Sequence, residues 1–347
     1  MSRLYKFSLL ATLYFSQGLP FGFFKTFLPY VMRDQGASLV GIGLAHLLSL
    51  PWALKFLWAP LLDRYGSARL GHRRGWILLL QASSALVLLC LAWMGEVSLK
   101  ALLWGFVLTN LLAATQDIAS DGLAVLVLNS EERGVGNGIQ VAAYRLGMIG
   151  GGGLILLLLP HWGQARIFLA VALMILAASI PVFFCREPVV AISKDTNWLG
   201  DLREALVRPG ILRWLAVLVL LKFGDEMTSA MLVPFLKDQG LSIDQVGTLI
   251  GTIGSALGMA GALFAGWLMV RLNRWWTCVV LCFAQAFACL VYLIPGEWVW
   301  GGFASLTGFE HFIGGMATTA IFTLMMDVSR REAPGTDYTL QASAVIL

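Results

Sequence analysis

Residues 34–43 read DQGASLVGIG, and residues 238–247 read DQGLSIDQVG. Asp, Gln, Gly, Ser and the last Gly match at a constant offset of 204. A weaker echo sets SEERGVGNG from Ser130 against SRREAPGTD from Ser329, at an offset of 199. Two echoes in the same order at nearly the same offset indicate that the chain contains an internal duplication.

The duplicated segments separate long apolar runs. The 347 residues are 58% hydrophobic and 13% charged, whereas about a quarter of the residues of a soluble domain are charged. A helix crosses a bilayer with about 20 apolar residues, so we predict ten membrane spans and the start of an eleventh near Tyr338. They cover residues 7–31, 39–62, 75–95, 101–128, 136–160, 165–185, 210–236, 244–270, 275–295 and 299–328.

The repeat offset amounts to six spans, an even number, so both halves enter the membrane in the same direction. We therefore predict an all-α polytopic membrane protein with two parallel six-helix halves. The first is 1–185, the cytoplasmic linker is 186–209, and the second is 210–347. Residues 148–185 find no counterpart in the second half, which we expect to be incomplete, ending after the tenth span or early in the eleventh.

The charged loops predict the orientation. With the N-terminus inside, the cytoplasmic loops carry sixteen Lys and Arg residues and the opposite loops carry four. Because cytoplasmic loops retain basic residues, we expect a cytoplasmic N-terminus. The sixteen are Arg3, Lys6, Arg64, Arg69, Arg73, Arg74, Arg133, Arg186, Lys194, Arg203, Arg208, Arg213, Arg271, Arg274, Arg330 and Arg331.

Ionisable residues inside spans are costly and therefore functional candidates. We expect those of this chain to line the solute cavity or to couple transport to protons; static ion pairs that only hold helices together are the alternative. Equal depth in the membrane predicts an Asp121–Arg145 pair, and Lys55 is a candidate counter-charge for Asp117. The candidates are Lys25, Asp117, Asp121, Arg145, Lys222, Asp225, Glu226 and Glu310, with Lys222 predicted to pair with Asp225 and Glu226.

Glycines mark close helix packing. The run from Gly150 to Gly153 lies inside a span, and the eighth span contains a GxxxG at 254–258. Such surfaces let helix backbones approach. We expect spans 5 and 8 to meet through them, either as a sliding interface or as plain tight packing.

The loop LLDRYGSARLGHRRGW, residues 61–76, resembles the loop signature of the major facilitator superfamily. We expect it to form a cytoplasmic gating latch in which Asp63 caps or bonds a neighbouring helix end. The latch residues are Asp63, Arg64, Gly66, Arg73 and Arg74. The second-half counterpart GWLMVRLNR from Gly266 lacks the acid, which argues against a matching latch there.

Longer motifs resemble one branch of that superfamily. LPWALKFLWAPLLDRYG from Leu50, QDIASDG from Gln116, EERGVGNGIQVAAYRLGM from Glu131 and LKFGDEM from Leu221 resemble the AmpG-like branch. That branch includes muropeptide permeases and siderophore importers, and QGLPFGFF from Gln17 is more similar to the siderophore importers. The resemblance implies import driven by the proton-motive force, with Asp117 and Asp121 as the acidic pair of the QDxxxD motif.

We therefore predict an alternating-access transporter in a bacterial inner membrane, without a cofactor or metal, acting as a monomer on a bulky polar solute such as a siderophore or muropeptide. The solute would bind near the midplane between the halves. A polytopic membrane enzyme and a channel are the alternatives. An enzyme would show a catalytic cluster at one membrane face, and a channel more often has short symmetric subunits rather than a tandem duplication.

Overall fold

The computed structural model describes residues 1–34, 36, 38, 46–67, 70–95, 97–188, 197–293 and 300–346. Helices and turns make up these ranges, with one isolated β-bridge between Ser67 and Gly71, so the all-α prediction is confirmed. Most of the first repeat copy, 34–43, lies outside the described residues. The same holds for Arg69, for Lys194 and for the middle of the predicted linker.

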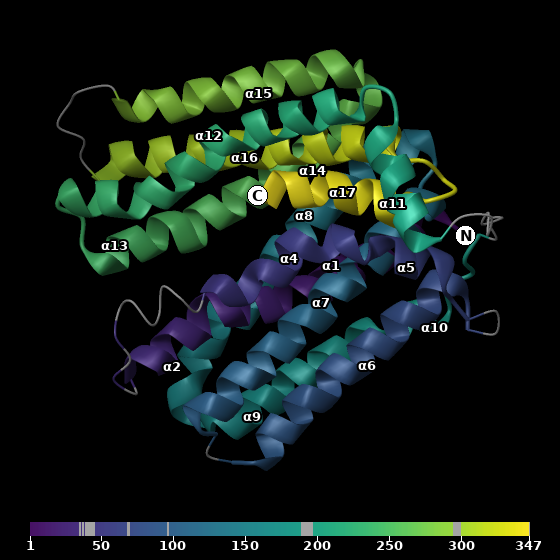
Figure 1. Cartoon of the computed structure of the whole chain (residues 1–347). Coiled ribbons are helices and arrows are strands. Elements are labelled where there is room, and N and C mark those ends of the chain that lie inside the picture. Colours follow the sequence, from purple (N-terminus) through teal and green to yellow (C-terminus); the bar gives the residue numbers. More distant parts are fainter. Residues whose placement is uncertain are drawn as a thin grey trace. The chain divides into compact units, whose positions relative to one another are not determined.

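The chain forms two compact units (Figure 1). Unit 1 comprises Met1–Val127, Ala143–Arg208 and Ser329–Leu347, and unit 2 comprises Leu128–Ala142 and Pro209–Val328. Each unit therefore contains a short segment of the other predicted half. The predicted halves 1–185 and 210–347, with the linker 186–209, stay predictions.

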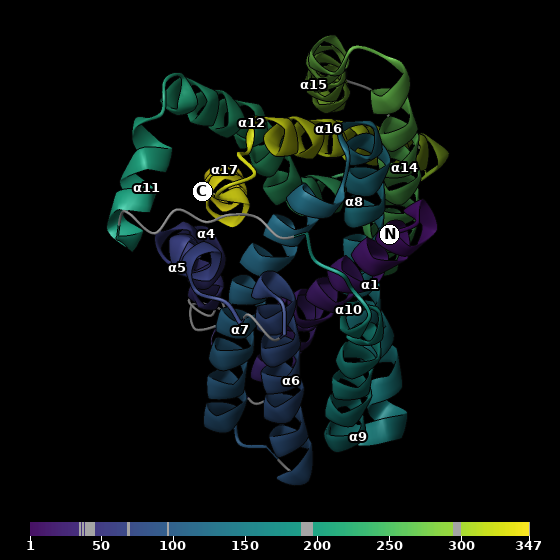
Figure 2. The same cartoon turned by 90° about the vertical axis from the view of Figure 1, so that its right-hand side faces the viewer.

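Unit 1 holds the helices of the first predicted spans. Its long helices α6, α7 and α9 run side by side (Figure 2). Its elements are α1 (Arg3–Gly22), η1 (Phe23–Phe27), α2 (Leu28–Asp34), η2 (His46–Ser49), α4 (Leu50–Leu54), η3 (Lys55–Leu57), α5 (Ala59–Arg64), α6 (His72–Trp93), α7 (Leu99–Val127), η5 (Gly150–Leu154), α9 (Ile155–Ala178), α10 (Ile180–Phe183), α11 (Trp198–Val207) and α17 (Pro334–Ile346).

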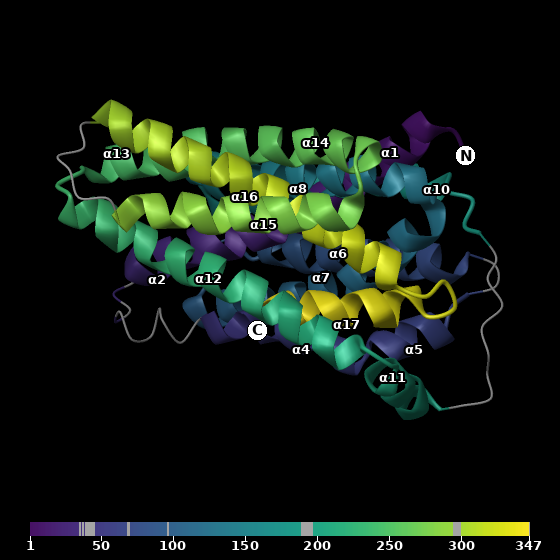
Figure 3. The same ribbon diagram turned by 90° about the horizontal axis from the view of Figure 1, so that it is seen from above.

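Unit 2 holds the later spans, and its helices α15 and α16 lie side by side (Figure 3). The helix α8 (Arg133–Ile149) begins in unit 2 and ends in unit 1. The other elements of unit 2 are η4 (Ser130–Glu132), α12 (Ile211–Asp238), α13 (Ile243–Gly247), η6 (Thr248–Gly254), α14 (Ser255–Arg271), α15 (Arg274–Leu290), η7 (Val291–Leu293) and α16 (Trp300–Val328).

Among the described residues, six helical stretches are long and apolar enough to cross a membrane. They are His72–Trp93, Leu99–Val127, Ser130–Phe183, Asp244–Arg271, Arg274–Leu293 and Gly301–Val328. The 54 residues of Ser130–Phe183 would measure about 80 Å as one helix, against about 30 Å of hydrocarbon. Gly163, with φ +71°, interrupts the helix, which separates the predicted fifth span from the sixth.

The exposed face of α6 is apolar, and polar side chains are among the residues that the helix buries. On α6, Leu79, Leu86 and Trp93 recur every seven residues and are exposed, whereas Gln81 and Ser84 on the other side are buried. A soluble helix would bury the apolar face and expose the amide. An exposed apolar face, with amide and hydroxyl groups buried on the other side, fits a helix surrounded by lipid.

Glycines set the closest helix contacts, but only partly where expected. Gly151 of the predicted run packs against the Leu19 carbonyl of α1, which a Cβ would approach to 2.0 Å. Spans 5 and 8 meet at Gly138, where a Cβ would lie 2.7 Å from the Ala262 carbonyl, and Gly134, just before span 5, lies equally close to the Gly266 carbonyl. The expectation that the 254–258 GxxxG forms this contact is wrong, because Gly258 packs against α16. A glycine motif indicates a close neighbour without saying which helix it is.

Candidate functional site

A buried ion pair lies between η3 and α7 in unit 1. The ammonium of Lys55 contacts a carboxylate oxygen of Asp117, and the side chains are 1% and 10% exposed. The same ammonium lies 5.5 Å from the ring centroid of Trp52, one residue after Pro51, in the broken helix that carries Lys55. The predicted role of Lys55 as counter-charge to Asp117 is confirmed.

Asp121, one turn from Asp117 on α7, has a partner on α1 that the sequence did not indicate. The hydroxyl of Tyr14 on α1 donates to the Asp121 carboxylate at 2.6 Å, and both residues are buried. Arg145 is partly buried, and its predicted pair with Asp121 stays a prediction. Lys25 is exposed on the π-helix η1, a distortion that is frequent at functional sites.

Neutral polar side chains continue this site between α1, α6 and α7. The hydroxyl of Ser16 accepts a hydrogen bond from the amide of Gln81 at 3.0 Å and donates to the Leu13 carbonyl at 2.7 Å. The amide of Gln116 lies 3.4 Å from the same hydroxyl. Beside Ser16, the amide of Gln17 is buried and has no hydrogen-bond partner among the described residues. Buried polar groups of this kind take ordered water.

Unit 2 contains a second charged cluster, on α12, α15 and α16. Lys222 contacts Asp225 and lies 3.7 Å from Glu226, so both predicted pairs are confirmed. The amide nitrogen of Gln285 donates to Asp225 at 3.0 Å and to Glu310 at 2.9 Å. Glu310 is buried, whereas the side chain of Glu226 is 66% exposed. Three helices therefore share one polar network.

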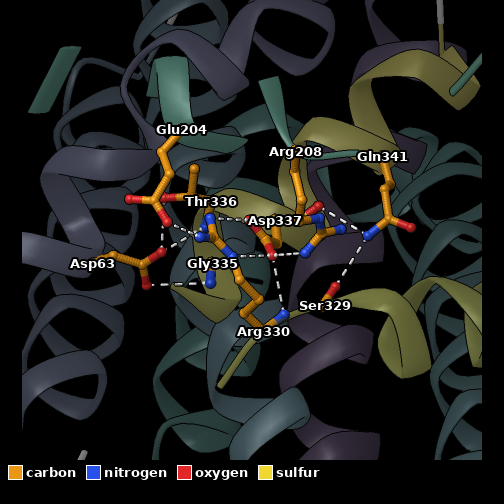
Figure 4. A network of polar contacts seen from close by, with 9 residues as sticks. All are labelled: Asp63, Glu204, Arg208, Ser329, Arg330, Gly335, Thr336, Asp337 and Gln341. Carbon is orange, nitrogen blue, oxygen red and sulfur yellow. Dashed lines mark hydrogen bonds and ion pairs between the residues drawn. The ribbon is translucent and has the colours of Figure 1, made fainter. Parts of the chain in front are cut away.

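The predicted latch residue Asp63 caps a helix end, as expected. Its carboxylate accepts hydrogen bonds from the backbone N–H of Gly335 at 3.2 Å and of Thr336 at 2.6 Å, and from the Thr336 hydroxyl at 2.8 Å (Figure 4). These groups lie in the first turn of α17, which starts with Pro334. The backbone N–H groups of a first helical turn have no acceptor within the helix, and Asp63 supplies one here. A carboxylate at a helix N-terminus is favoured by the helix dipole. Arg73 pairs with the same carboxylate.

The basic end of the loop is held by an acid that the sequence did not single out. Glu187 accepts hydrogen bonds from the backbone N–H of Arg73 at 2.9 Å and of Arg74 at 3.2 Å, and so caps the start of α6. The guanidinium of Arg74 donates to the Cys185 carbonyl at 3.0 Å. A Cβ on Gly66 would lie 2.4 Å from the His72 ring, so a larger residue at this position would have to displace that ring.

Asp337 on α17 is the centre of a further network (Figure 4). Both carboxylate oxygens accept from the Arg330 guanidinium, each at 2.9 Å, and Arg208 donates to the same carboxylate at 2.8 Å. These hydrogen bonds to Asp337 raise the pKa of Arg330 above its usual range, so the arginine stays charged. Glu204 of α11 contacts Arg330, and Asp201 of α11 lies 3.3 Å from Arg64, which places a third latch residue in an ion pair.

Unit 2 has an ion-pair cluster of its own at the start of α15. Asp327, near the end of α16, lies 2.8 Å from Arg133 and 2.7 Å from Arg274. The loop before Arg274 lacks an acid, as the sequence showed. The acid that contacts Arg274 comes from α16 instead, and the absence of a matching latch in the second half stays a prediction.

Comparison with known proteins identifies the family. The family model described as Major Facilitator Superfamily matches residues 10–345. This chain belongs to the major facilitator superfamily. As a member of the superfamily it is a polytopic membrane transporter and not an enzyme.

Its similarity to individual members of the superfamily extends over nearly the whole chain. It is 31% identical over 346 residues to the anhydromuropeptide permease of Escherichia coli K12, covering 96% of this chain and 70% of that protein. A putative transporter AmpG 4 of Rickettsia conorii is 24% identical over 94% of this chain and 83% of that protein. The AmpG-like resemblance is thereby confirmed.

A solved structure shows the same fold. The major facilitator transporter FucP in its outward conformation has a TM-score of 0.77 with 15% identity, covering 99% of this chain and 90% of that chain. At this identity the likeness establishes the fold alone. The expected major facilitator fold is therefore confirmed by the family match and by this structural neighbour.

Several site residues of this major facilitator protein escaped sequence reasoning. Tyr14 and Gln285 are uncharged, and they are identified as site residues only by their hydrogen bonds to Asp121 and Glu310. Glu187 could have been found, because an acid between Arg186 and Pro188 at the end of a span can cap a nearby helix.

Proposed function

We propose that this transporter imports an anhydro-muramyl peptide or a closely related bulky polar solute by alternating access, driven by protons. The single observation that carries the solute class is the 31% identity, over 96% of the chain, to the anhydromuropeptide permease of Escherichia coli K12. We further propose a bacterial inner membrane, a cytoplasmic N-terminus and a monomeric carrier, on the basis of the loop charges and the relatives.

The Lys55–Asp117 pair supports proton coupling. Two opposite charges in a span are tolerated together, whereas one alone costs at least about 2.5–3.5 kcal/mol on insertion scales. A proton on Asp117 removes the charge that holds Lys55 and leaves the lysine uncompensated, so proton binding would favour opening of the pair. Asp121 lies one turn away and accepts from Tyr14, which offers a hydroxyl next to the acidic pair.

The contacts of Asp63 support a gating role. In the predicted division of the chain, α17 belongs to the second half and Asp63 to the first, although both lie in unit 1 of the structure. On that division the hydrogen bonds of Asp63 would join the two halves at one membrane face. Alternating access requires the halves to separate at each face in turn. The hydrogen bonds between Asp63 and Thr336 must therefore break and reform in every transport cycle.

The remaining predicted residues complete the proposal. Lys25, Arg145, Lys222, Asp225, Glu226 and Glu310 line the solute path or respond to the proton. Static ion pairs are the alternative, and they would make these residues matter for folding but not for the pH dependence of uptake. A channel would conduct without saturation or counterflow.

The test uses cells that produce the protein, offered labelled anhydro-muropeptide or a labelled ferric siderophore. We expect saturable accumulation of the muropeptide that collapses with the pH gradient. Asp117→Asn should abolish accumulation and retain counterflow, whereas Asp238→Asn, an exposed carboxylate at the end of α12, should behave as wild type. Accumulation of the siderophore alone would overturn the solute assignment, and uptake that ignores a collapsed pH gradient would overturn proton coupling.

A further inference from the structure

Two adjacent residues of α16 form a close pair of ionisable groups. The Nδ1 atom of His311 lies 2.6 Å from a carboxylate oxygen of Glu310 and 3.1 Å from the Thr307 carbonyl oxygen. Two acceptor atoms without a hydrogen between them would repel at 2.6 Å, so a proton must lie between the imidazole and the carboxylate. The Nδ1 contact with Thr307 favours an imidazole that carries this hydrogen on Nδ1.

The charges of the cluster leave room for one more proton. Glu226 is 66% exposed and keeps its charge in contact with water, so the count concerns the buried groups. Among these, Lys222 and Asp225 cancel each other, and a neutral His311 leaves Glu310 with a net negative charge. The amide of Gln285 hydrogen bonds to Glu310 but brings no charge. An uncompensated buried charge in a membrane span is costly, and the buried groups of the cluster become neutral together when Glu310 and His311 bind one more proton.

We propose that Glu310 and His311 form a proton-binding dyad in unit 2, separate from the Lys55–Asp117 pair, and that Gln285 links the dyad to the Lys222–Asp225 pair. Its ligand is the proton itself, bound from water. The amide nitrogen of Gln285 donates to both Asp225 and Glu310, at 3.0 and 2.9 Å. Protonation of the dyad weakens the hydrogen bond to Glu310, and the amide then donates mainly to Asp225.

The surroundings of the dyad are specific. A Cβ on Gly254 would lie 2.5 Å from the His311 ring, so the ring is seated against the bare backbone of the π-helix η6. The neighbouring groups that titrate come from α12, α15 and η7. They are Lys222, Asp225 and Glu226 on α12, Cys289 within 3.7 Å of the Gln285 amide nitrogen, and Tyr292, whose hydroxyl lies 3.4 Å from Thr307.

The dyad can be measured with protons alone, without any solute. The purified full chain, with ¹⁵N-labelled histidine, is titrated while NMR follows the imidazole of His311 and infrared spectroscopy follows the C=O stretch of a protonated carboxyl group. His311→Asn assigns the imidazole signal, and Glu310→Gln, which keeps the side-chain shape, assigns the carboxyl. We expect wild type to bind one proton at the dyad. We expect neither variant to bind it in the same way.

Two matched variants sharpen the result. Glu226→Gln removes an exposed acid of the same cluster and should leave the titration of His311 unchanged. Gly254→Ala keeps every ionisable group and displaces the ring, so it should uncouple the titration of His311 from Glu310. A His311 signal that titrates identically in wild type and Glu310→Gln would overturn the dyad.

The consequence for transport rests on the proposed proton coupling. If that coupling holds, His311→Asn should reduce proton-driven accumulation by about tenfold or more while counterflow stays within about twofold. Equal accumulation in His311→Asn and wild type would overturn a role of the dyad in transport. Failure of coupling in wild type would overturn the proposed function and leave the spectroscopic test of the dyad intact.

Discussion

Replacing Asp63 by Asn should release the first turn of α17. The wild-type carboxylate accepts from two backbone N–H groups, from the Thr336 hydroxyl and from Arg73, and its side chain is 8% exposed. Asn keeps one acceptor oxygen and loses the charge, so the buried Arg73 keeps only Glu187, at 3.4 Å, as an acidic partner. Removing one member of a buried pair costs about 3–5 kcal/mol, and we take about 3 kcal/mol because the shape is retained.

That loss should appear as faster hydrogen exchange at the amides of Gly335 and Thr336, measured by mass spectrometry on a peptide that covers them. About 3 kcal/mol corresponds to a factor of about 150 in the opening equilibrium. The control is Asp201→Asn, which removes a partly exposed partner of Arg64, a contact of 3.3 Å that we expect to be worth less than about 1 kcal/mol. Unchanged exchange in Asp63→Asn, or equal acceleration in both variants, would refute the capping argument.

Two further predictions concern packing and the second cluster. Gly151→Ala places a methyl group 2.0 Å from the Leu19 carbonyl, so we expect a loss of about 1–3 kcal/mol in stability. The loss is measured as a lower midpoint of thermal unfolding in detergent, and an unchanged midpoint would contradict the close packing. Asp327→Asn leaves Arg133 and Arg274 facing each other with a neutral partner, and we expect a loss of about 1–3 kcal/mol by the same assay, with wild-type stability as the contrary result.

The helices could be predicted from the sequence because length and hydropathy set them directly. The boundary near Gly163 followed from turn residues between two apolar runs, and the structure gives that glycine a positive φ. The Lys222 pairs were predictable too, because residues three and four apart share a helix face. Local geometry of this kind needs no knowledge of the neighbouring helix.

Contacts between helices were harder to predict, since they depend on how each helix is rotated. Depth along the membrane suggested Arg145 for Asp121, and that pair stays a prediction; it gave no sign of Tyr14, because a depth match does not tell which face a residue occupies. The GxxxG at 254–258 was assigned to the wrong neighbour for the same reason. Lys55 was found as the partner of Asp117 because a buried lysine in a span has few alternatives.

Proton movement during solute entry tests the central claim most directly. Purified protein in liposomes, with a pH-sensitive dye inside and no imposed pH gradient, is supplied with anhydro-muropeptide. The account predicts that wild type acidifies the interior as the solute enters, and that Asp117→Asn exchanges solute across the membrane without any acidification. Solute entry through wild type with no proton movement, or acidification that persists in Asp117→Asn, would contradict it.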